Sequence, residues 1–434
     1  MQYYNTNDKK SQYTFKDSLI MGIAPGMGLF FPKSIKALPT EFIINLKKTD
    51  PKEIAFRIAR EYIGSEIDEP DLRTIVNETL DFQIPLVQLE DHTYALELFH
   101  GPTCAFKDVG ARFLSRCLKY FLKNNTKALT ILVATSGDTG SAVANGFLGI
   151  EHINVIILYP KGKVSLLQEK QLTTLGRNIT AIEVNGTFDD CQMLVKQVFM
   201  DKELNKVIDL TSANSINIGR LIPQSFYYFI ALSLLPENTG DVFISVPSGN
   251  FGNLTAGLFA KRMGLGIKKF IASTNVNKIV PDYIETGVFS PKESIQTISN
   301  AMDVGNPNNF SRILELYGSD WQQIRHDIAG FHYTDHETRQ AMMHVYKKDG
   351  YILDPHGAVA YLGLKNYMIK HRGTGVFLET AHPAKFANIV EDTIGAKVDI
   401  PEQLRECLQK EKVSVQLDAD FKSFKDFLLH KEQS

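Results

Sequence analysis

A lysine within an apolar run is the first feature of this chain that could do chemistry. In the segment His100-Gly-Pro-Thr-Cys-Ala-Phe-Lys107-Asp108, Lys107 directly follows Ala105 and Phe106. Partial burial lowers the pKa of a lysine and leaves a free amine that can form a Schiff base. Most lysines are solvated surface residues, however, so this segment alone is weak support for a reactive amine.

Two segments rich in small residues predict anion-binding loops. Thr135-Ser-Gly-Asp138-Thr-Gly-Ser141 and Pro247-Ser-Gly249-Asn-Phe-Gly252-Asn253 each follow a β-branched run and precede a helical pattern. Backbone N–H groups at a helix start can hold a carboxylate or a phosphate, and glycine lets the backbone come close to the anion. The second segment has neither a Walker loop nor a dinucleotide-binding fingerprint, which favours a single phosphate. The alternative for the first segment is a plain strand-to-helix turn capped by Thr139.

A threonine hydroxyl is the fourth feature of the sequence that could take part in chemistry. In the segment Thr380-Ala-His-Pro-Ala-Lys385-Phe, Thr380 follows a predicted strand that ends at Leu378. Its hydroxyl can form a hydrogen bond with a ring nitrogen, and a helix cap is an equal alternative. A reactive lysine, two anion loops and a hydroxyl are the parts that pyridoxal phosphate needs, because this cofactor carries an aldehyde, a phosphate and a pyridine nitrogen. The sequence therefore predicts a pyridoxal-phosphate site.

Short β-branched runs alternate with helical patterns through the centre of the chain. The runs lie at 129–134, 154–159, 180–184, 242–246, 269–273 and 375–378, and the helical patterns at 139–148, 165–175, 188–200, 216–235 and 254–263. This alternation predicts βαβ units and mainly parallel sheets covered by helices. The units are too many for one sheet, so we expect an α/β fold of two lobes with the active site in the cleft between them.

The predicted fold divides into three segments. Residues 1–90 form a mostly helical N-terminal domain, with a capped amphipathic helix that begins at Asp50-Pro51. Residues 91–386 form the cofactor-binding core of two lobes, and 387–434 a helical appendage. The apolar stretch 19–31 is similar to the core of a signal peptide, but glycines and Pro25 interrupt it, so we expect a loop there.

The composition argues against several kinds of partner. The 434 residues include 47 basic and 49 acidic ones, a net charge of −2, so no basic excess favours nucleic acid. The four cysteines form no C-x-x-C pair, which argues against a disulfide framework or a zinc cluster. The apolar stretch 226–235 is shorter than the ~18–20 residues of a membrane span. We expect a cytoplasmic protein that binds neither nucleic acid nor membrane.

Three histidines, His332, His336 and His344, could be read as metal ligands. Thr334 and Glu337 form a capping-box pattern, however, so a helix begins there and His332 lies outside it. We therefore predict no metal site.

Eight segments together resemble the signature sequences of the bacterial-type threonine synthase family. They comprise the four described above, the run Ser212-Ala-Asn-Ser-Ile-Asn, and segments at 28–32, 300–303 and 355–361, in order over nearly the whole chain. The resemblance implies the fold of the tryptophan synthase β subunit, which is fold type II of the pyridoxal-phosphate enzymes. Glu379 stands where the family pattern has glycine, and its side chain either lies near the ring nitrogen or points to solvent.

The same resemblance implies a role for each site residue. Lys107 carries the cofactor and moves protons, Asp138 lies beside the 3-oxygen of the ring, and Thr380 meets the ring nitrogen. The cofactor phosphate is held by Gly249, Asn250, Phe251, Gly252 and Asn253. The substrate carboxylate is held by Thr135, Ser136, Gly137 and Thr139, and the substrate phosphate by Asn214, Ser215 and Arg220.

The resemblance implies a carbon–oxygen lyase that acts on phosphates. It would convert O-phosphohomoserine and water to threonine and phosphate by γ-elimination and β-addition of water, the last step of threonine biosynthesis. One alternative is another fold type II lyase, a phospholyase or a serine/threonine dehydratase, although Arg220 and Asn214 favour a phosphorylated substrate. Another is a catalytically silent binding protein, against which Lys107 argues. We expect a monomer or a homodimer.

Overall fold

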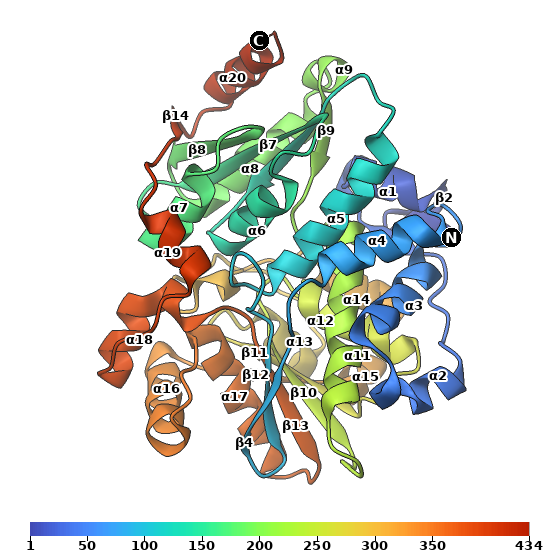
Figure 1. The fold of residues 1–434 in the computed structure, drawn as a ribbon, viewed down its shortest axis with the longest axis vertical. Coiled ribbons are helices and arrows are strands. Elements are labelled where there is room, and N and C mark those ends of the chain that lie inside the picture. The colour runs from blue at the N-terminus through green and yellow to red at the C-terminus, as the bar shows by residue number, and fades with distance from the viewer. Residues whose placement is uncertain (434) are drawn as a thin grey trace.

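The chain forms two α/β lobes and a smaller N-terminal sheet. The computed structural model describes residues 1–433, and the strands of this part form sheets of six, five and three strands. Figure 1 shows the five-stranded sheet in the upper lobe and the six-stranded sheet in the lower lobe, with helices around both. This architecture confirms the prediction of a two-lobed α/β fold with parallel and mixed sheets.

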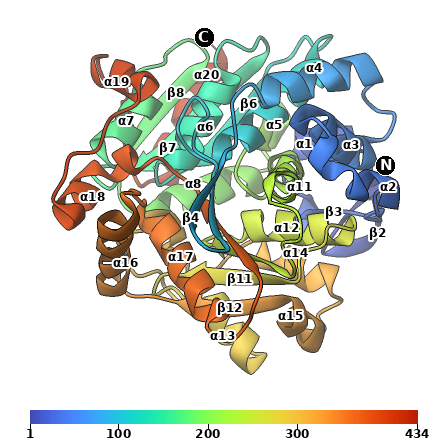
Figure 2. The same ribbon diagram turned by 60° about the horizontal axis from the view of Figure 1, so that its bottom comes forward.

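The six-stranded sheet has the order β12-β11-β10-β13-β5-β4 and is parallel except for β4. Its strands are β4 (Leu86–Glu90), β5 (Thr93–Glu97), β10 (Val242–Pro247), β11 (Lys269–Thr274), β12 (Ile328–His332) and β13 (Thr374–Glu379). Helix α17 (Pro355–Met368) packs on β10, β11 and β13, with α16 (Asp335–Asp349) beside it (Figure 2). Helices α13 (Ile279–Thr286) and α15 (Trp321–Asp327) contact β11 and β12. Strands β10 and β13 are buried along their whole length, as in parallel sheets with both faces covered.

The five-stranded sheet is entirely parallel, in the order β14-β8-β7-β6-β9. Its strands are β6 (Leu129–Ala134), β7 (Ile153–Pro160), β8 (Ile179–Asn185), β9 (Asp209–Ser212) and β14 (Val415–Asp418). Helix α8 (Phe188–Met200) packs on β6 and β7, and α6 (Asp138–Phe147) lies between β7 and the helices α5 (Lys107–Leu122) and α7 (Leu166–Thr173). Helix α20 (Phe421–Gln433) packs on α8, and α9 (Leu204–Val207) precedes β9.

The N-terminal segment combines helices with a sheet that the sequence did not predict. Strands β1 (Tyr3–Asn5), β2 (Asp8–Tyr13) and β3 (Phe30–Pro32) are antiparallel, and the helices are α1 (Phe15–Met21), α2 (Thr40–Ile44), α3 (Pro51–Ile63) and α4 (Glu69–Thr79). The cap of α3 is confirmed, because the Asp50 side chain accepts from the N–H of Lys52. The loop predicted at 19–31 is wrong at both ends, since Leu19 packs into the core from α1 and Phe30 pairs with β1.

The remaining helices connect these layers. They are α10 (Ile218–Leu221), α11 (Ser225–Leu234), α12 (Gly252–Arg262), α14 (Phe310–Leu316), α18 (Ala387–Ile394) and α19 (Glu402–Leu408), with 3₁₀ turns at η1 (Pro25–Met27), η2 (Leu46–Lys48), η3 (Ile222–Gln224), η4 (Asn300–Met302) and η5 (Pro383–Phe386). The helix predicted at 216–235 is divided into α10, η3 and α11 around Pro223, which has no N–H to donate. In the described part of the chain, no helix is long and apolar enough to cross a membrane.

All six predicted strands are present, as β6, β7, β8, β10, β11 and β13, while β4, β5, β9, β12 and β14 were not predicted. Strand β14 belongs to the C-terminal segment, for which the sequence indicated helices only. Figure 1 shows this segment running from α18 beside the lower lobe to α20 on the upper lobe, so it contacts both. The predicted boundary near residue 90 falls in the turn between β4 and β5, which pair in one sheet.

Candidate active site

A cavity of about 800 Å³ lies at the carboxyl ends of β6, β10 and β13, between the two lobes. This is where open α/β sheets bind their ligands. Of the predicted site residues, those that line it are Lys107, Thr135, Ser136, Asp138, Thr139, Asn214, Ser215, Arg220, Gly249, Asn250, Phe251, Gly252, Asn253 and Thr380. Gly137 alone does not line it. Five segments far apart in the chain therefore meet in one place, and three of them are the loops that the sequence placed at strand ends, after β6, β10 and β13.

Lys107 begins helix α5 and points its amine into the cavity. Only 16% of its side chain is exposed, and its Nζ lies 4.8 Å from the centre of the Phe106 ring. Burial lowers the pKa of Lys107, and the nearby charges of Lys385 and Arg220 lower it further, while Asp138 acts in the opposite direction. The direction of this shift is the one that the apolar neighbours in the sequence predicted, and it favours a free amine.

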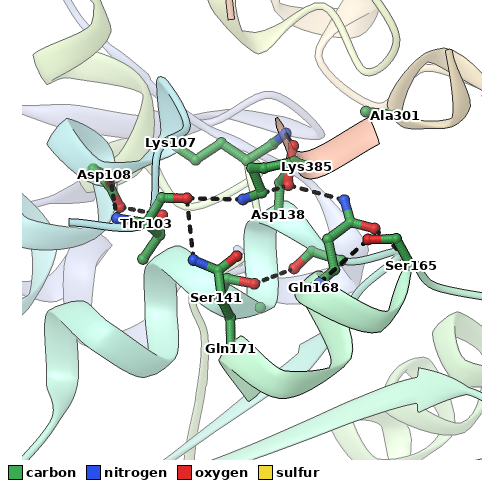
Figure 3. Close-up of polar contacts among 12 residues, drawn as sticks. Thr103, Lys107, Asp108, Asp138, Ser141, Ser165, Gln168, Gln171, Ala301 and Lys385 are labelled. Carbon is green, nitrogen blue, oxygen red and sulfur yellow. Dashed lines mark hydrogen bonds and ion pairs between the residues drawn. The ribbon is translucent and has the colours of Figure 1, made fainter. Parts of the chain in front are cut away.

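Asp138 lies between two lysines (Figure 3). Its Oδ1 is 2.8 Å from Nζ of Lys385 and accepts from Nε2 of Gln168 at 3.0 Å, while its Oδ2 is 3.6 Å from Nζ of Lys107. Burial alone would raise the pKa of Asp138, but the neighbouring lysines, above all Lys385, together with hydrogen bonds from Lys385 and Gln168, outweigh it and hold that pKa below its usual range. Asp138 is therefore a carboxylate. Lys385, which is completely buried, was not predicted as a site residue, although it lies in the same signature segment as Thr380.

The loop after β6 is shaped by Thr135. Its hydroxyl oxygen accepts from the N–H groups of both Gly137 and Gly140, at 2.9 Å each. Gly137 has φ 135°, a conformation that favours glycine, and a Cβ there would lie 2.5 Å from the Gln168 side chain. Helix α6 begins at Asp138, so Thr139 lies in its first turn and does not cap it. The loop thus presents a helix N-terminus to the cavity, with Thr135 and Gly137 building its shape.

The loop after β10 forms a cradle at the start of α12. Phe251 has a left-handed backbone conformation, with φ 60° and ψ 15°, which is unusual for a bulky residue and which no sequence pattern predicted. Gly252 lines the cavity, and a Cβ there would meet Asn309 Nδ2 at 3.3 Å, Asn309 Cγ at 3.9 Å and Ser215 Cβ at 3.7 Å. A Cβ on Gly249 would lie 2.4 Å from the carbonyl oxygen of Ala301. Gly249 is therefore needed for packing, and a side chain at Gly252 would crowd Asn309 at the wall of the cavity.

Arg220 is a buried cation without a carboxylate partner. Its side chain is 2% exposed, one terminal nitrogen donates to the carbonyl of Ala213, and its Nε has no hydrogen-bond partner. No carboxylate of residues 1–433 lies within ion-pair distance of it. Burial lowers its pKa to about 10, so it stays charged at neutral pH. Asn214, which also lines the cavity, has an unpartnered Oδ1, and Asn250 donates to the hydroxyl of Ser215 at 2.6 Å.

Strand β13 ends at Glu379, and Thr380 follows it directly. The carbonyl of Thr380 accepts from the N–H of Phe106, which ties this strand end to the Lys107 segment. Glu379 does not point to solvent: it is completely buried, with no hydrogen-bond donor on either carboxyl oxygen. Burial and the neighbouring Asp354 raise the pKa of Glu379 well above its usual range, so its proton is available for a hydrogen bond to Asp354. Asp354 in turn lies 2.6 Å from Nδ1 of His356.

The predicted capping box is confirmed near the three histidines. The Thr334 side chain accepts from the N–H of Glu337, whose carboxylate accepts from the N–H of Thr334, and α16 begins at Asp335. His332 ends strand β12, outside this helix.

The donor groups of the cavity fit pyridoxal phosphate. The amine of Lys107 suits an aldehyde, the hydroxyl of Thr380 a pyridine nitrogen, and the first turn of α12 has N–H groups without intrahelical partners for a phosphate. Gly252 lines the cavity at this helix start, and its lack of a side chain would let the backbone come close to such a phosphate.

Comparison with known proteins agrees with this fit. The sequence profile of pyridoxal-phosphate dependent enzymes matches residues 79–377. The fold and the site thus define a pyridoxal-phosphate-dependent enzyme of the two-lobed α/β kind.

Closer relatives identify the family. Profiles of the threonine synthase N terminus and C-terminal region match residues 2–80 and 357–428. Threonine synthase of Haemophilus influenzae is 46% identical over 99% of this chain and 100% of its own length, and that of Escherichia coli 44% over the same shares. The chain belongs to the threonine synthase family.

Solved structures give the same result. The Escherichia coli threonine synthase crystal structure superposes with a TM-score of 0.94 at 43% identity, covering 99% of this chain and 100% of that one. A pyridoxal-phosphate-bound threonine synthase from Brucella melitensis has a TM-score of 0.93 at 34% identity, with both chains covered completely. A threonine deaminase from Solanum lycopersicum reaches only 0.56 at 12% identity over 84% of this chain, and so shares the fold alone.

Proposed function

We propose that the cleft around Lys107 converts O-phosphohomoserine and water to threonine and phosphate. As a member of the threonine synthase family, the chain is a pyridoxal-phosphate-dependent lyase of threonine biosynthesis. The observation that carries the substrate assignment is the buried guanidinium of Arg220, which lacks a carboxylate partner and lines the same cavity as the amine of Lys107. An unpaired buried cation is costly, and a phosphorylated substrate would supply the missing anion.

Each part of the cavity has a task in this reaction. When bound, pyridoxal phosphate supplies the electron sink that stabilises negative charge on the substrate carbon. Lys107 removes and returns protons at the α- and β-carbons, for which its lowered pKa suits it. Arg220, Asn214 and Ser215 hold the substrate phosphate and stabilise it as it leaves.

The other loops orient the two molecules. Ser136 and Thr139 line the cavity at the start of α6, where N–H groups face the position proposed for the substrate carboxylate. Thr135 and Gly137 hold that loop in shape. Residues 249–253 would hold the cofactor phosphate, Thr380 would bond to its ring nitrogen and Asp138 would interact with its ring oxygen, since all of them line the cavity. The predictions of cytoplasmic location, of a monomer or homodimer, and of the absence of nucleic-acid partners remain predictions.

The product of O-phosphohomoserine decides between this function and its rivals. The protein loaded with pyridoxal phosphate should release phosphate and threonine in equal amounts, measured by a phosphate assay and amino-acid chromatography. Phosphate with 2-oxobutanoate instead of threonine would show a phospholyase. No release from the loaded protein would exclude both of these functions, and activity on serine or threonine would then distinguish a dehydratase from a silent binding protein. Lys107→Ala is the matched control, because it should form neither product.

A further inference from the structure

The Asp138 carboxylate lies closer to Lys385 than to Lys107. Its Oδ1 is 2.8 Å from Nζ of Lys385, whereas its Oδ2 is 3.6 Å from Nζ of Lys107 (Figure 3). The first distance is that of a charge-assisted hydrogen bond and the second is longer than one. Lys385, and not the reactive lysine, is therefore the close partner of this carboxylate.

Lys385 is held in this position by its surroundings. Its side chain is 0% exposed, and its Nζ also donates to the carbonyl of Thr103 at 2.9 Å. Lys385 lies in the turn η5, which is capped at its N-terminus by the His382 side chain, the acceptor of a hydrogen bond from the N–H of Ala384. A buried ammonium needs an anion, and Asp138 is the one carboxylate of residues 1–433 in ion-pair contact with it. The pair of Asp138 and Lys385 thus satisfies both charges without Lys107.

We propose that Lys385 is a positioning residue of the reaction: by neutralising Asp138, it prevents that carboxylate from holding the amine of Lys107 as an ammonium ion. This inference rests on the proposed function, in which Lys107 must act as a free amine. Lys385 itself need not contact the substrate, since its effect passes through Asp138.

The charges around Lys107 support this assignment. Asp138 faces it from α6, Lys385 from η5 and Arg220 from α10. Burial lowers the pKa of Lys107 most, and Lys385 lowers it too, while Asp138 raises it. Removing Lys385 would therefore raise the pKa of Lys107 in two ways. A cation that repels the ammonium form is lost, and the carboxylate of Asp138, which attracts it, no longer has another partner.

The test compares three variants without using substrate: Lys385→Met, Asp138→Asn and the double variant. Each cofactor-free full-length protein is labelled with acetic anhydride from pH 6 to pH 10, and the labelling rate of Lys107 is followed by peptide mass spectrometry. Only the neutral amine reacts, so one unit of pKa changes the rate about tenfold below the midpoint. Lys425→Met is the matched control, because Lys425 makes an ion pair of the same 2.8 Å length with Asp201 outside the cleft.

Lys385→Met should label Lys107 at pH 8 at least about tenfold more slowly than the parent protein. In the double variant the released carboxylate is absent, so the rate should return to within about threefold of the parent, as it should in Lys425→Met. Asp138→Asn should label at least as fast as the parent. The double variant removes both buried charges together and is expected to fold even where Lys385→Met does not.

Two results would overturn the inference. One is an unchanged labelling rate in folded Lys385→Met, and the other is a double variant that is still slowed tenfold. A second readout is the affinity for pyridoxal phosphate, which should fall in Lys385→Met, because an ammonium ion at Lys107 cannot form a Schiff base. Neither measurement uses O-phosphohomoserine, so a protein that labels as expected but makes no threonine would refute the proposed function alone.

Discussion

Replacing Arg220 by methionine distinguishes the effect of this buried charge on stability from its effect on catalysis. Methionine has most of the volume of arginine, so its side chain can still pack against Gly110, which Arg220 contacts. The change removes a guanidinium that is 2% exposed and has no carboxylate partner among residues 1–433. It also leaves the carbonyl of Ala213 without its donor. These two effects oppose each other, so we expect the free energy of unfolding without ligands to change by no more than ~1 kcal/mol.

We expect Arg220→Met to lower the catalytic efficiency. A hydrogen bond to a charged group contributes about 1.5–3 kcal/mol, so kcat/KM for O-phosphohomoserine should fall roughly 10- to 150-fold. Phosphate release measures kcat/KM, urea denaturation the stability, and visible absorbance the bound cofactor, which should be unchanged.

Arg112→Met is the control for a buried arginine outside the cleft. Arg112 is also mostly buried, but it is paired with Asp81 and the carbonyl of Glu78. This variant should lose stability and keep the kcat/KM of the folded protein. The reasoning about Arg220 is refuted if Arg220→Met retains the parent kcat/KM, or if it loses cofactor while its kinetics per bound cofactor stay normal.

Four further substitutions test other parts of the site. Lys107→Ala should abolish threonine formation and leave the thermal unfolding of the cofactor-free protein within a few degrees, and appreciable turnover would contradict its role. Gly252→Val should fold, since its Cβ meets only one atom closer than 3.4 Å, but it should no longer retain the cofactor. Gly249→Val should lose both cofactor and stability, because its Cβ would lie 2.4 Å from the Ala301 carbonyl oxygen. Absorbance after dialysis measures the bound cofactor of each variant, and unfolding curves measure its stability. Burial raises the pKa of Glu379 above that of the unfolded chain, so stability falls as pH rises from the unfolded pKa towards the folded one. Glu379→Gln should therefore stabilise the fold by an amount that grows by up to ~1.4 kcal/mol per pH unit above about pH 5, and an equal gain at pH 5 and pH 8 would contradict this.

The sequence predicted the lobes well because their strands are apolar, β-branched and flanked by small residues. The sheet that it missed lies at the N-terminus, where β2 reads Asp-Lys-Lys-Ser-Gln-Tyr and is largely exposed. Such a strand has no alternation of apolar and polar residues, and it is held by its pairing with β1. Edge strands of this kind are decided by tertiary contacts that no local pattern contains.

The same distinction applies to the site. The loops that hold Asp138, Gly252 and Thr380 could be placed at strand ends, because parallel strands bring their carboxyl ends to one edge. The pairing of Asp138 with Lys385 could not, since the two residues are distant in sequence and meet only when the lobes fold together. The left-handed Phe251 was equally unpredictable, because local propensity disfavours that conformation for an aromatic residue.

The burial of Glu379 also couples its position to position 357. A Cβ on Gly357 would lie 2.0, 2.3 and 2.5 Å from the three atoms of the Glu379 carboxyl group. A side chain at position 357 therefore requires the buried carboxyl group to move or the glutamate to be replaced by a smaller residue. The effect of a substitution at 357 on stability thus depends on the residue at 379, and the effects of substitutions at the two positions should not be additive.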